Sequence, residues 1–286
     1  MTIPAAGAGQ TSAAQMQAER ARAFRALHEG PGPLLLPNPW DAGSARLLAS
    51  LGFAALATTS GGFAATLGRL DGGVTRDEAL GHAAAIVAAT PLPVSADLEN
   101  AFADEPAGVA ETIGLAAATG LAGCSVEDFT RRPGEPIYDL GLARERVAAA
   151  ASAAKAAPGP LVLTARAENY LHGRPDLADT IRRLQAYQEA GADVLYAPGL
   201  ASLADIRAVV SSVDRPVNVL AFPGTPAVPQ LAAAGVRRIS VGSAFSNAAL
   251  GALVSAAREL RDEGTYGFLD LAATGRAQAS DAFRAQ

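Results

Sequence analysis

The sequence predicts a single (β/α)8 barrel of the TIM type, and three observations support this fold class. Eight short runs rich in leucine or β-branched residues recur along the 286 residues of the chain. Their first residues lie about 29 positions apart, the length of a strand followed by a crossover helix. Several runs also follow an alanine-rich helical segment that ends in glycine, which takes the left-handed conformation of a helix C-terminus without steric cost.

The predicted strands are distributed evenly over most of the chain, at residues 34–37, 54–58, 93–98, 122–127, 161–166, 193–197, 216–220 and 237–242. The helix-ending glycines are Gly52, Gly120, Gly191 and Gly235. An open α/β sheet would show a similar alternation of elements. Eight similar units without a glycine-rich dinucleotide fingerprint after the first strand favour closure into a barrel.

Two segments fall outside the eight units. We expect residues 1–30 to form an N-terminal helical extension, in which 14–28 covers the N-terminal end of the barrel. Residues 31–262 would form the catalytic barrel. Residues 263–286 would form a tail that packs on a neighbouring subunit through Tyr266, Phe268 and Leu269.

Composition excludes several classes of protein. Half of the residues are hydrophobic and 18% are charged, which is enough apolar material for a sizeable core. The net charge is −5, and no run of lysine or arginine exceeds two residues, so neither nucleic acid nor an anionic membrane is expected as a partner. The N-terminus lacks the pattern of a signal peptide, no apolar run approaches ~18 residues, and Cys124 is the single cysteine. These features predict a cytoplasmic protein.

Polar residues cluster where the predicted strands end, and in such a barrel these ends build the active site. Several carboxylates meeting there would repel one another unless a cation lay among them. Oxygen ligands without clustered histidine or cysteine suit Mg²⁺ or Mn²⁺. Asp97 and Glu99 are the best candidates for metal ligands. The alternative is that this pair forms a solvated strand end or a helix N-cap, with Asp104 as another candidate for the N-cap. The strand-end residues are Asn38, Trp40, Asp41, Thr58, Thr59, Ser60, Gly61, Gly62, Asp97, Glu99, Glu127, Asp128, Arg166, Glu168, Asn169, Asn218, Ser240 and Ser243.

Arg166 could grip a substrate carboxylate through two parallel hydrogen bonds, or it could form a structural ion pair with Glu127 or Glu168. The run Ser60-Gly61-Gly62 could offer backbone N–H groups to an anion, or it could be a flexible turn.

The remaining titratable candidates are three histidines and the cysteine. We expect His28 and His82 on the surface. His172 is expected in a surface loop after the fifth strand, with a position at the mouth of the barrel as the alternative. Cys124 is expected to be a small core residue and not a nucleophile.

Several segments, taken together, resemble the isocitrate lyase/phosphoenolpyruvate mutase superfamily, in its phosphoenolpyruvate mutase and oxaloacetate decarboxylase branch. They are NPWDAGSARLLASLGFAALATTSGG, LGRLDGG, PVSADLEN, GLAGCSVED, LTARAENY, EAGADVLYAPGL and RPVNVLAFPG, and they span roughly residues 34–260. The resemblance implies a Mg²⁺-dependent barrel enzyme that acts on 2-oxo acids. It also implies a homo-oligomer, a dimer or a homotetramer, in which a C-terminal helix is exchanged between subunits.

The resemblance also implies roles for particular residues. Asp97 would bind the metal directly, and Glu99, Glu127 and Asp71 would act largely through metal-bound water. Substrate would be bound by Trp40, Ser60, Gly61, Gly62, Arg166 and Asn218, with Ser60, Gly61, Arg166 and Glu127 taking part in catalysis.

The chain departs from two branches of that family. Lyases that split isocitrate or methylisocitrate carry a catalytic cysteine in the loop after the fourth strand, whereas this loop reads EDFTRRPGEPIYD. Phosphonate mutases have a lysine where Phe129 stands and a histidine near Pro198. We therefore predict carbon–carbon cleavage of the oxaloacetate decarboxylase type, through a metal-stabilised enolate of a small 2-oxo or 2-hydroxy carboxylate. Carbon–phosphorus cleavage of phosphonopyruvate and a 2-oxo acid binder with little activity remain the alternatives.

The loop from Phe129 to Tyr138 contains two arginines, two prolines and a glycine. We expect a mobile lid that brings Arg131 or Arg132 into the site when substrate binds. A surface loop whose arginines pair with Glu135 or Asp139 is the alternative.

Overall fold

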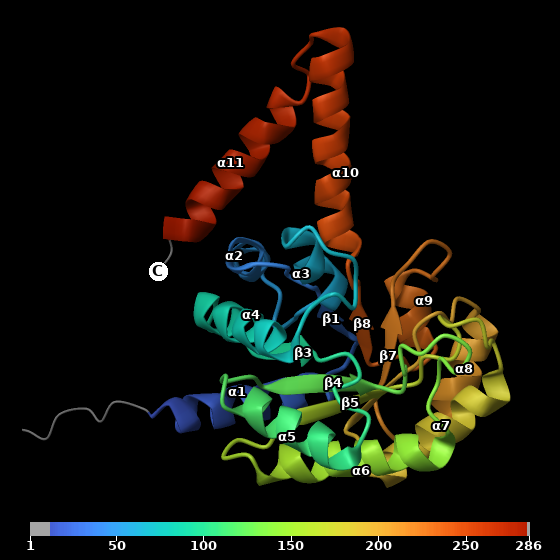
Figure 1. Ribbon diagram of the computed structural model, residues 1–286. Coiled ribbons are helices and arrows are strands. Elements are labelled where there is room, and N and C mark those ends of the chain that lie inside the picture. The colour runs from blue at the N-terminus through green and yellow to red at the C-terminus, as the bar shows by residue number, and fades with distance from the viewer. Residues whose placement is uncertain (1–11, 285–286) are drawn as a thin grey trace, which may run out of the picture.

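Eight parallel strands form a barrel surrounded by helices in the computed structural model, which describes residues 12–284 (Figure 1). The strands are β1 (Leu34–Leu36), β2 (Leu56–Ala57), β3 (Val94–Asp97), β4 (Gly123–Glu127), β5 (Val162–Arg166), β6 (Val194–Tyr196), β7 (Val217–Leu220) and β8 (Arg238–Ser240). Each lies within one of the eight runs predicted from the sequence. The predicted TIM-type barrel is confirmed.

The helices alternate with the strands, and most of them cover the outside of the barrel. They are α1 (Ala13–Leu27), α2 (Ala42–Ser50), α3 (Ser60–Thr66), α4 (Arg76–Ala89), α5 (Pro106–Ala117), α6 (Leu140–Ala156), α7 (Leu177–Glu189), α8 (Leu203–Ser211), α9 (Val228–Ala233), α10 (Ala244–Arg258) and α11 (Leu269–Arg284), with a π-helical turn at Glu259–Glu263. Side-chain caps fix where several of them begin. Asp41, Thr75 and Asp176, for example, each accept a backbone N–H from the first turn.

The sheet closes almost completely. Its strand order is β1-β8-β7-β6-β5-β4-β3-β2, with every neighbouring pair parallel. The remaining junction, between β1 and β2, is joined by a backbone hydrogen bond of 3.0 Å from the N–H of Ala57 to the carbonyl of Pro37. The carboxyl ends of all eight strands therefore surround one opening.

Helix α1 covers the opposite, N-terminal end of the barrel. Phe24 is fully buried there and packs in a cluster with Leu34, Ala122 and Val162 at the starts of three strands. The Gln17 amide donates to the carbonyls of Leu121 and Gly159, at 2.9 and 2.7 Å. The base of the barrel is therefore closed by one helix.

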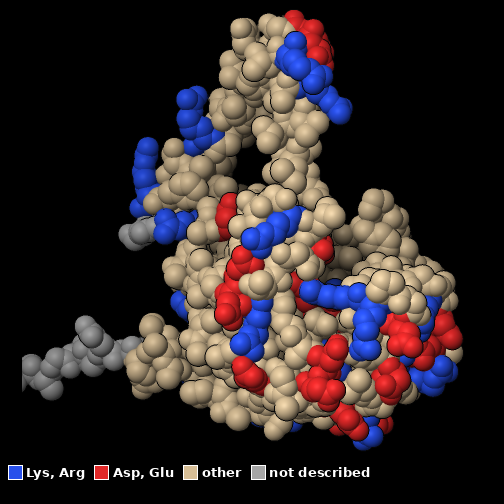
Figure 2. All heavy atoms as spheres, viewed as in Figure 1, with Lys and Arg blue, Asp and Glu red and all other residues tan. Residues whose placement is uncertain are grey.

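Helices α10 and α11 form an arm that projects from the barrel. Figure 1 shows α10 leaving the carboxyl end of β8 and α11 returning towards α2, on which it packs. The chain reverses at Gly264, whose φ of 69° lies in the left-handed region that glycine tolerates. In Figure 2 the charged side chains of this arm lie near its tip and along α11, whereas the part of α10 next to the barrel shows none.

No helix within residues 12–284 is long and apolar enough to cross a membrane.

Candidate active site

Two connected cavities occupy the carboxyl end of the barrel. The inner cavity has a volume of about 190 Å³ and the outer one about 470 Å³. Ser60, Asp71 and Arg166 line both, so the two form one continuous site. The site lies where the fold predicts it, above the strand ends.

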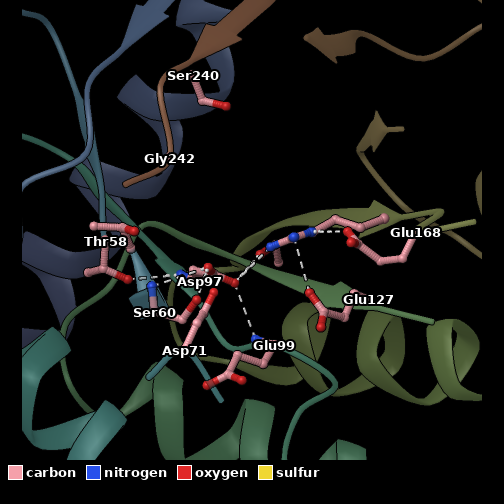
Figure 3. A network of polar contacts seen from close by, with 12 residues as sticks. Thr58, Ser60, Asp71, Asp97, Glu99, Glu127, Glu168, Ser240 and Gly242 are labelled. Carbon is pink, nitrogen blue, oxygen red and sulfur yellow. Dashed lines mark hydrogen bonds and ion pairs between the residues drawn. The ribbon is translucent and has the colours of Figure 1, made fainter. Parts of the chain in front are cut away.

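Asp97, the last residue of β3, lies at the centre of the polar network in Figure 3. Its Oδ2 accepts hydrogen bonds from the hydroxyl and the backbone N–H of Ser60, at 3.0 and 3.3 Å. Its own backbone N–H donates to the Thr58 hydroxyl at 2.9 Å. The side chain is 18% exposed, so the carboxylate remains open to the cavity while its orientation is fixed.

Arg166, the last residue of β5, contacts three carboxylates at once. Its Nη1 lies 2.9 Å from Asp97 Oδ1, its Nη2 3.2 Å from Glu127 Oε2 and its Nε 2.8 Å from Glu168 Oε1. Buried among these anions, the guanidinium has a pKa raised well above its usual value even though burial opposes the charge. Of the two roles considered for Arg166, the structure shows the ion-paired one.

Glu127 is buried, and burial together with the neighbouring Glu168 and Asp97 raises its pKa well above the usual value, against the lowering effect of Arg166. A carboxylate held in such surroundings gains from any further positive charge. This part of the site therefore favours a bound cation.

Glu99 is held differently from the other carboxylates. Its φ is 51°, an uncommon left-handed conformation for a residue with a side chain, and its carboxylate forms an ion pair with Arg131 from the loop after β4. Asp104, considered as a helix N-cap, is not one. Glu105 occupies that position of α5, and Asp104 accepts a hydrogen bond from the Tyr138 hydroxyl.

The segment Ser60-Gly61-Gly62 is the first turn of α3 and not a flexible turn. Thr59 caps the helix by accepting the N–H of Gly62 at 3.3 Å. A Cβ on Gly61 would lie 2.8 Å from Ser243 Oγ, and one on Gly62 would lie 2.5 Å from Thr59 Cγ2. Both glycines are therefore required by close packing beside the site.

The carboxylates predicted to hold a metal line the same opening without forming a closed metal centre. Within residues 12–284, no three histidine, cysteine or carboxylate side chains are gathered as ready-made ligands. Asp97 and Asp71 line the inner cavity, and Glu99 and Glu127 line the outer one. This set of oxygen donors fits a hard dication that keeps several waters and takes further oxygens from the substrate.

Of the six residues predicted to bind substrate, Ser60 and Arg166 line the cavities, whereas Trp40, Gly61, Gly62 and Asn218 line neither. Trp40 packs beside Gly62, and its carbonyl lies 3.0 Å from His82 Nε2. Asn218 is 1% exposed; its amide nitrogen donates to the Ser240 hydroxyl and its oxygen accepts from Arg238 Nε. From these positions, Trp40 and Asn218 can orient the residues that line the cavity.

The histidines lie in three different surroundings. The expectation of a surface position is wrong for His28, which is 4% exposed because it follows α1 at the closed base of the barrel. His82 is half-buried and stacks on Phe63. His172 lines the outer cavity, stacks on Phe129 with ring centroids 3.6 Å apart, and has its Nε2 3.7 Å from Glu168.

Cys124 is fully buried in β4, and burial raises the pKa of its thiol to about 12. It is a core residue, as predicted, and is not a nucleophile.

Sequence reasoning missed Arg238 and Tyr196, which line the inner cavity. Tyr196 ends β6 and lies beside Arg166, whose guanidinium carbon is 5.2 Å from the centre of the ring. Arg238 begins β8, and an arginine directly before Ile239 in a strand predicted to be buried was the available signal.

A family model described as phosphoenolpyruvate phosphomutase matches residues 24–261. The chain belongs to the phosphoenolpyruvate mutase/isocitrate lyase superfamily. This superfamily comprises carbon–carbon lyases, mutases and hydrolases. The resemblance seen in the sequence is thereby confirmed.

Four members illustrate the range of similarity. A putative lyase/mutase from Burkholderia cenocepacia superposes with a TM-score of 0.91 and 54% identity over 95% of this chain and 97% of that one. The 2-methylisocitrate lyase of Escherichia coli is 32% identical over 72% of this chain and 71% of its own length. An oxaloacetate decarboxylase of Pseudomonas paraeruginosa is 30% identical over 83% and 84%. A phosphonopyruvate hydrolase solved with oxalate and Mg²⁺ shares the fold at 23% identity, with a TM-score of 0.78 over 88% and 90%.

Proposed function

We propose that this superfamily member is a Mg²⁺- or Mn²⁺-dependent lyase that cleaves a carbon–carbon bond in a small 2-oxo or 2-hydroxy carboxylate. One observation supports this proposal most strongly. Four carboxylates and one arginine line the same opening at the carboxyl end of the barrel: Asp97, Asp71, Glu99, Glu127 and Arg166. Cleavage of the oxaloacetate decarboxylase type is favoured. The similarity to a bacterial oxaloacetate decarboxylase over most of both chains supports this choice.

The metal would be held directly by Asp97, with Asp71, Glu99 and Glu127 contributing largely through water. When bound, it would act as a Lewis acid on the 2-oxo and carboxylate oxygens. Asp97 is already oriented for this role by Ser60 and Thr58. Arg166 would then exchange its contact with Asp97 for one with the substrate carboxylate while Glu127 and Glu168 keep it in place.

In this reaction the bond to the departing carboxylate breaks, CO₂ leaves, and the electron pair stays on the 2-oxo fragment as an enolate. Arg166 and the residues around Ser60 and Gly61 would stabilise the developing charge. Protonation of the enolate carbon completes the product. Cys124 is fully buried and lines neither cavity, so it cannot supply that proton, whereas His172 lines the outer cavity.

Turnover by purified protein with Mg²⁺ tests this proposal. A panel of oxaloacetate, substituted malates and phosphonopyruvate should show release of a 2-oxo acid from oxaloacetate or a malate. Release of phosphate or rearrangement of phosphonopyruvate alone would favour carbon–phosphorus chemistry instead. Mg²⁺-dependent oxalate binding without turnover of any compound would mean that the protein is a 2-oxo acid binder.

A further inference from the structure

Arg238 is a buried arginine whose two side-chain acceptors are neutral, whereas the equally buried Arg146 donates to three backbone carbonyls. Arg238 is 4% exposed and donates from Nε to Asn218 Oδ1 at 2.9 Å and from Nη1 to Thr164 Oγ1 at 3.0 Å. No carboxylate between residues 12 and 284 forms an ion pair with it. Arg166 and Arg183, in contrast, each contact at least two carboxylates.

Two neutral acceptors compensate poorly for a buried guanidinium, which carries five N–H donors and a full charge. Burial lowers the pKa of Arg238 to about 10, so the side chain is still protonated at neutral pH. The inside of the barrel therefore holds a positive charge without a fixed counter-ion.

This charge is placed where a ligand can reach it. Arg238 lines the inner cavity together with Arg166 and Asp97. It precedes Ser240, at the end of β8, by two residues, and its Nη1 reaches Thr164, two residues before Arg166 on β5. Two residues of a strand span about 6 to 7 Å, so Arg238 lies one layer below the ring of carboxylates.

The neighbours of Arg238 hold it in a fixed orientation. The Asn218 amide donates to the Ser240 hydroxyl at 3.0 Å, which directs its oxygen towards Arg238 Nε. Asn218 itself is 1% exposed, so it acts on a ligand through Arg238 and Ser240. A cation oriented in this way before a ligand arrives is an effective anion subsite.

We propose that Arg238 forms a second carboxylate subsite at the base of the pocket, so that the preferred ligand is a 2-oxo or 2-hydroxy dicarboxylate. This inference rests on the proposed function, which places the first carboxylate and the 2-oxo group at the mouth, beside Asp97 and Arg166. The two ends of the ligand would then contact opposite ends of the inner cavity.

Arg238 suits a carboxylate that keeps its charge throughout the reaction. A cation bound to a group that leaves as CO₂ would stabilise the reactant more than the transition state. Arg238 therefore suits a 2-hydroxy dicarboxylate that is cleaved between carbons 2 and 3, because its far carboxylate is retained, better than oxaloacetate, whose far carboxylate leaves as CO₂.

The test compares two stable ligands of equal length, malate and 2-hydroxybutyrate, which differ in a terminal carboxylate. Their Mg²⁺-dependent affinities are measured by calorimetry for the wild type, Arg238→Met, Arg238→Lys and the matched control Arg237→Met. Arg237 is the neighbouring residue but is exposed, and it donates to the Gly30 carbonyl outside the cavity. Oxalate affinity is measured for every protein.

We expect the wild type and Arg237→Met to bind malate at least tenfold more tightly than 2-hydroxybutyrate. Arg238→Met should lose this preference and Arg238→Lys should keep part of it, while oxalate affinity stays within about threefold in all four. A wild type without preference, or a preference that survives in Arg238→Met, would overturn the subsite. If Arg238→Met does not fold, the preference for malate over 2-hydroxybutyrate in the wild type and its reduction in Arg238→Lys decide the test. A wild type that does not bind oxalate in the presence of Mg²⁺ would instead contradict the proposed function.

Discussion

Asp97 lies among like charges, and this determines what its removal should do. In Asp97→Ala, the Arg166 guanidinium keeps Glu127 and Glu168 as partners, so we expect a folded protein with nearly unchanged thermal stability. Mg²⁺-dependent binding of oxalate should be abolished, because the residue proposed to bind the metal directly is missing. Calorimetry with and without Mg²⁺ measures both quantities. Unchanged Mg²⁺-dependent oxalate affinity would remove Asp97 from the metal site.

Arg166→Lys tests whether the planar guanidinium is needed for substrate. A lysine ammonium is a point charge that cannot contact three carboxylates and a substrate with the same geometry. We expect substrate binding to weaken by ~1.5 to 3 kcal/mol, the scale of a lost charged hydrogen bond. Steady-state kinetics on the best substrate of the panel would show this. A variant with wild-type KM and kcat would make Arg166 a structural residue.

The sequence identified residues at strand ends better than residues inside strands. Asp97, Glu127 and Arg166 follow apolar runs and could be placed at the mouth from the periodicity alone. Arg238 could not, because a polar residue two positions before a strand end is expected to face a packed interior. The role of Arg238 depends on the acceptors of its hydrogen bonds, Asn218 of β7 and Thr164 of β5. These residues lie 20 and 74 positions away in the sequence.

At the scale of elements, the packing of α1 on the barrel should depend on pH through His28. Burial, reinforced by the charge of Arg238, lowers the pKa of His28 to about 4 from 6.5. Between these values the unfolded chain binds more protons than the folded one, so stability present at neutral pH is lost as the pH falls from 6.5 towards 4. From pH 7.5 to pH 5 this contribution amounts to about 2 kcal/mol.

Urea unfolding at the two pH values, compared between the wild type and His28→Gln, isolates the contribution of this group. The variant should lose about 2 kcal/mol less than the wild type on acidification. Equal losses in the two proteins would mean that His28 is not held neutral in the fold.

The loop from Phe129 to Tyr138 is a short hairpin over the outer cavity, with an antiparallel bridge between Phe129 and Ile137. Its two arginines contact different partners. Neither arginine pairs with Glu135 or Asp139, the partners considered in the sequence analysis. Arg131 forms an ion pair with Glu99 and donates to the Gly72 carbonyl at 3.1 Å, whereas Arg132 is half exposed and lies 3.6 Å from Asp104. Arg131 is therefore the arginine that lines the outer cavity, and it is the one that we expect to act as the lid closes.

We expect Arg131→Ala to lower turnover by at least ~tenfold, about 1.4 kcal/mol of transition-state stabilisation, with little change in thermal stability. Arg132→Ala is the matched control and should keep nearly full turnover. Wild-type kcat in Arg131→Ala, or equal losses in both variants, would contradict a lid that acts through Arg131.

Regular elements were easier to predict than the segments that begin or end with glycine. The eight strands were found because burial on both faces gives short, continuous apolar runs. Helix α3 was not expected because Gly61 and Gly62 are poor helix formers, and the close approach of Ser243 and Thr59 overrides that tendency.

At the scale of the whole molecule, about half of the exposed large apolar side chains lie on the arm formed by α10 and α11. They belong to both helices and to the turn between them: Phe245, Leu250, Leu253, Val254, Leu260, Tyr266, Leu269, Leu271 and Phe283. Leu253 and Leu271 are 64% and 63% exposed. An apolar surface of this extent on a projecting arm is typical of a subunit interface.

A second copy of the chain is the partner we expect on this arm, in a dimer or tetramer that exchanges the C-terminal helices. The double variant Leu253→Glu/Leu271→Glu would place charges on the shared surface and should convert the oligomer to monomers, because an unpaired buried charge is costly. Leu70→Glu is the matched control, since Leu70 is 87% exposed and lies on the loop between α3 and α4. Light scattering coupled to size-exclusion chromatography measures the mass of each protein. A wild type that is monomeric at micromolar concentration would contradict the exchange, and an unchanged mass in the double variant would place the subunit interface elsewhere.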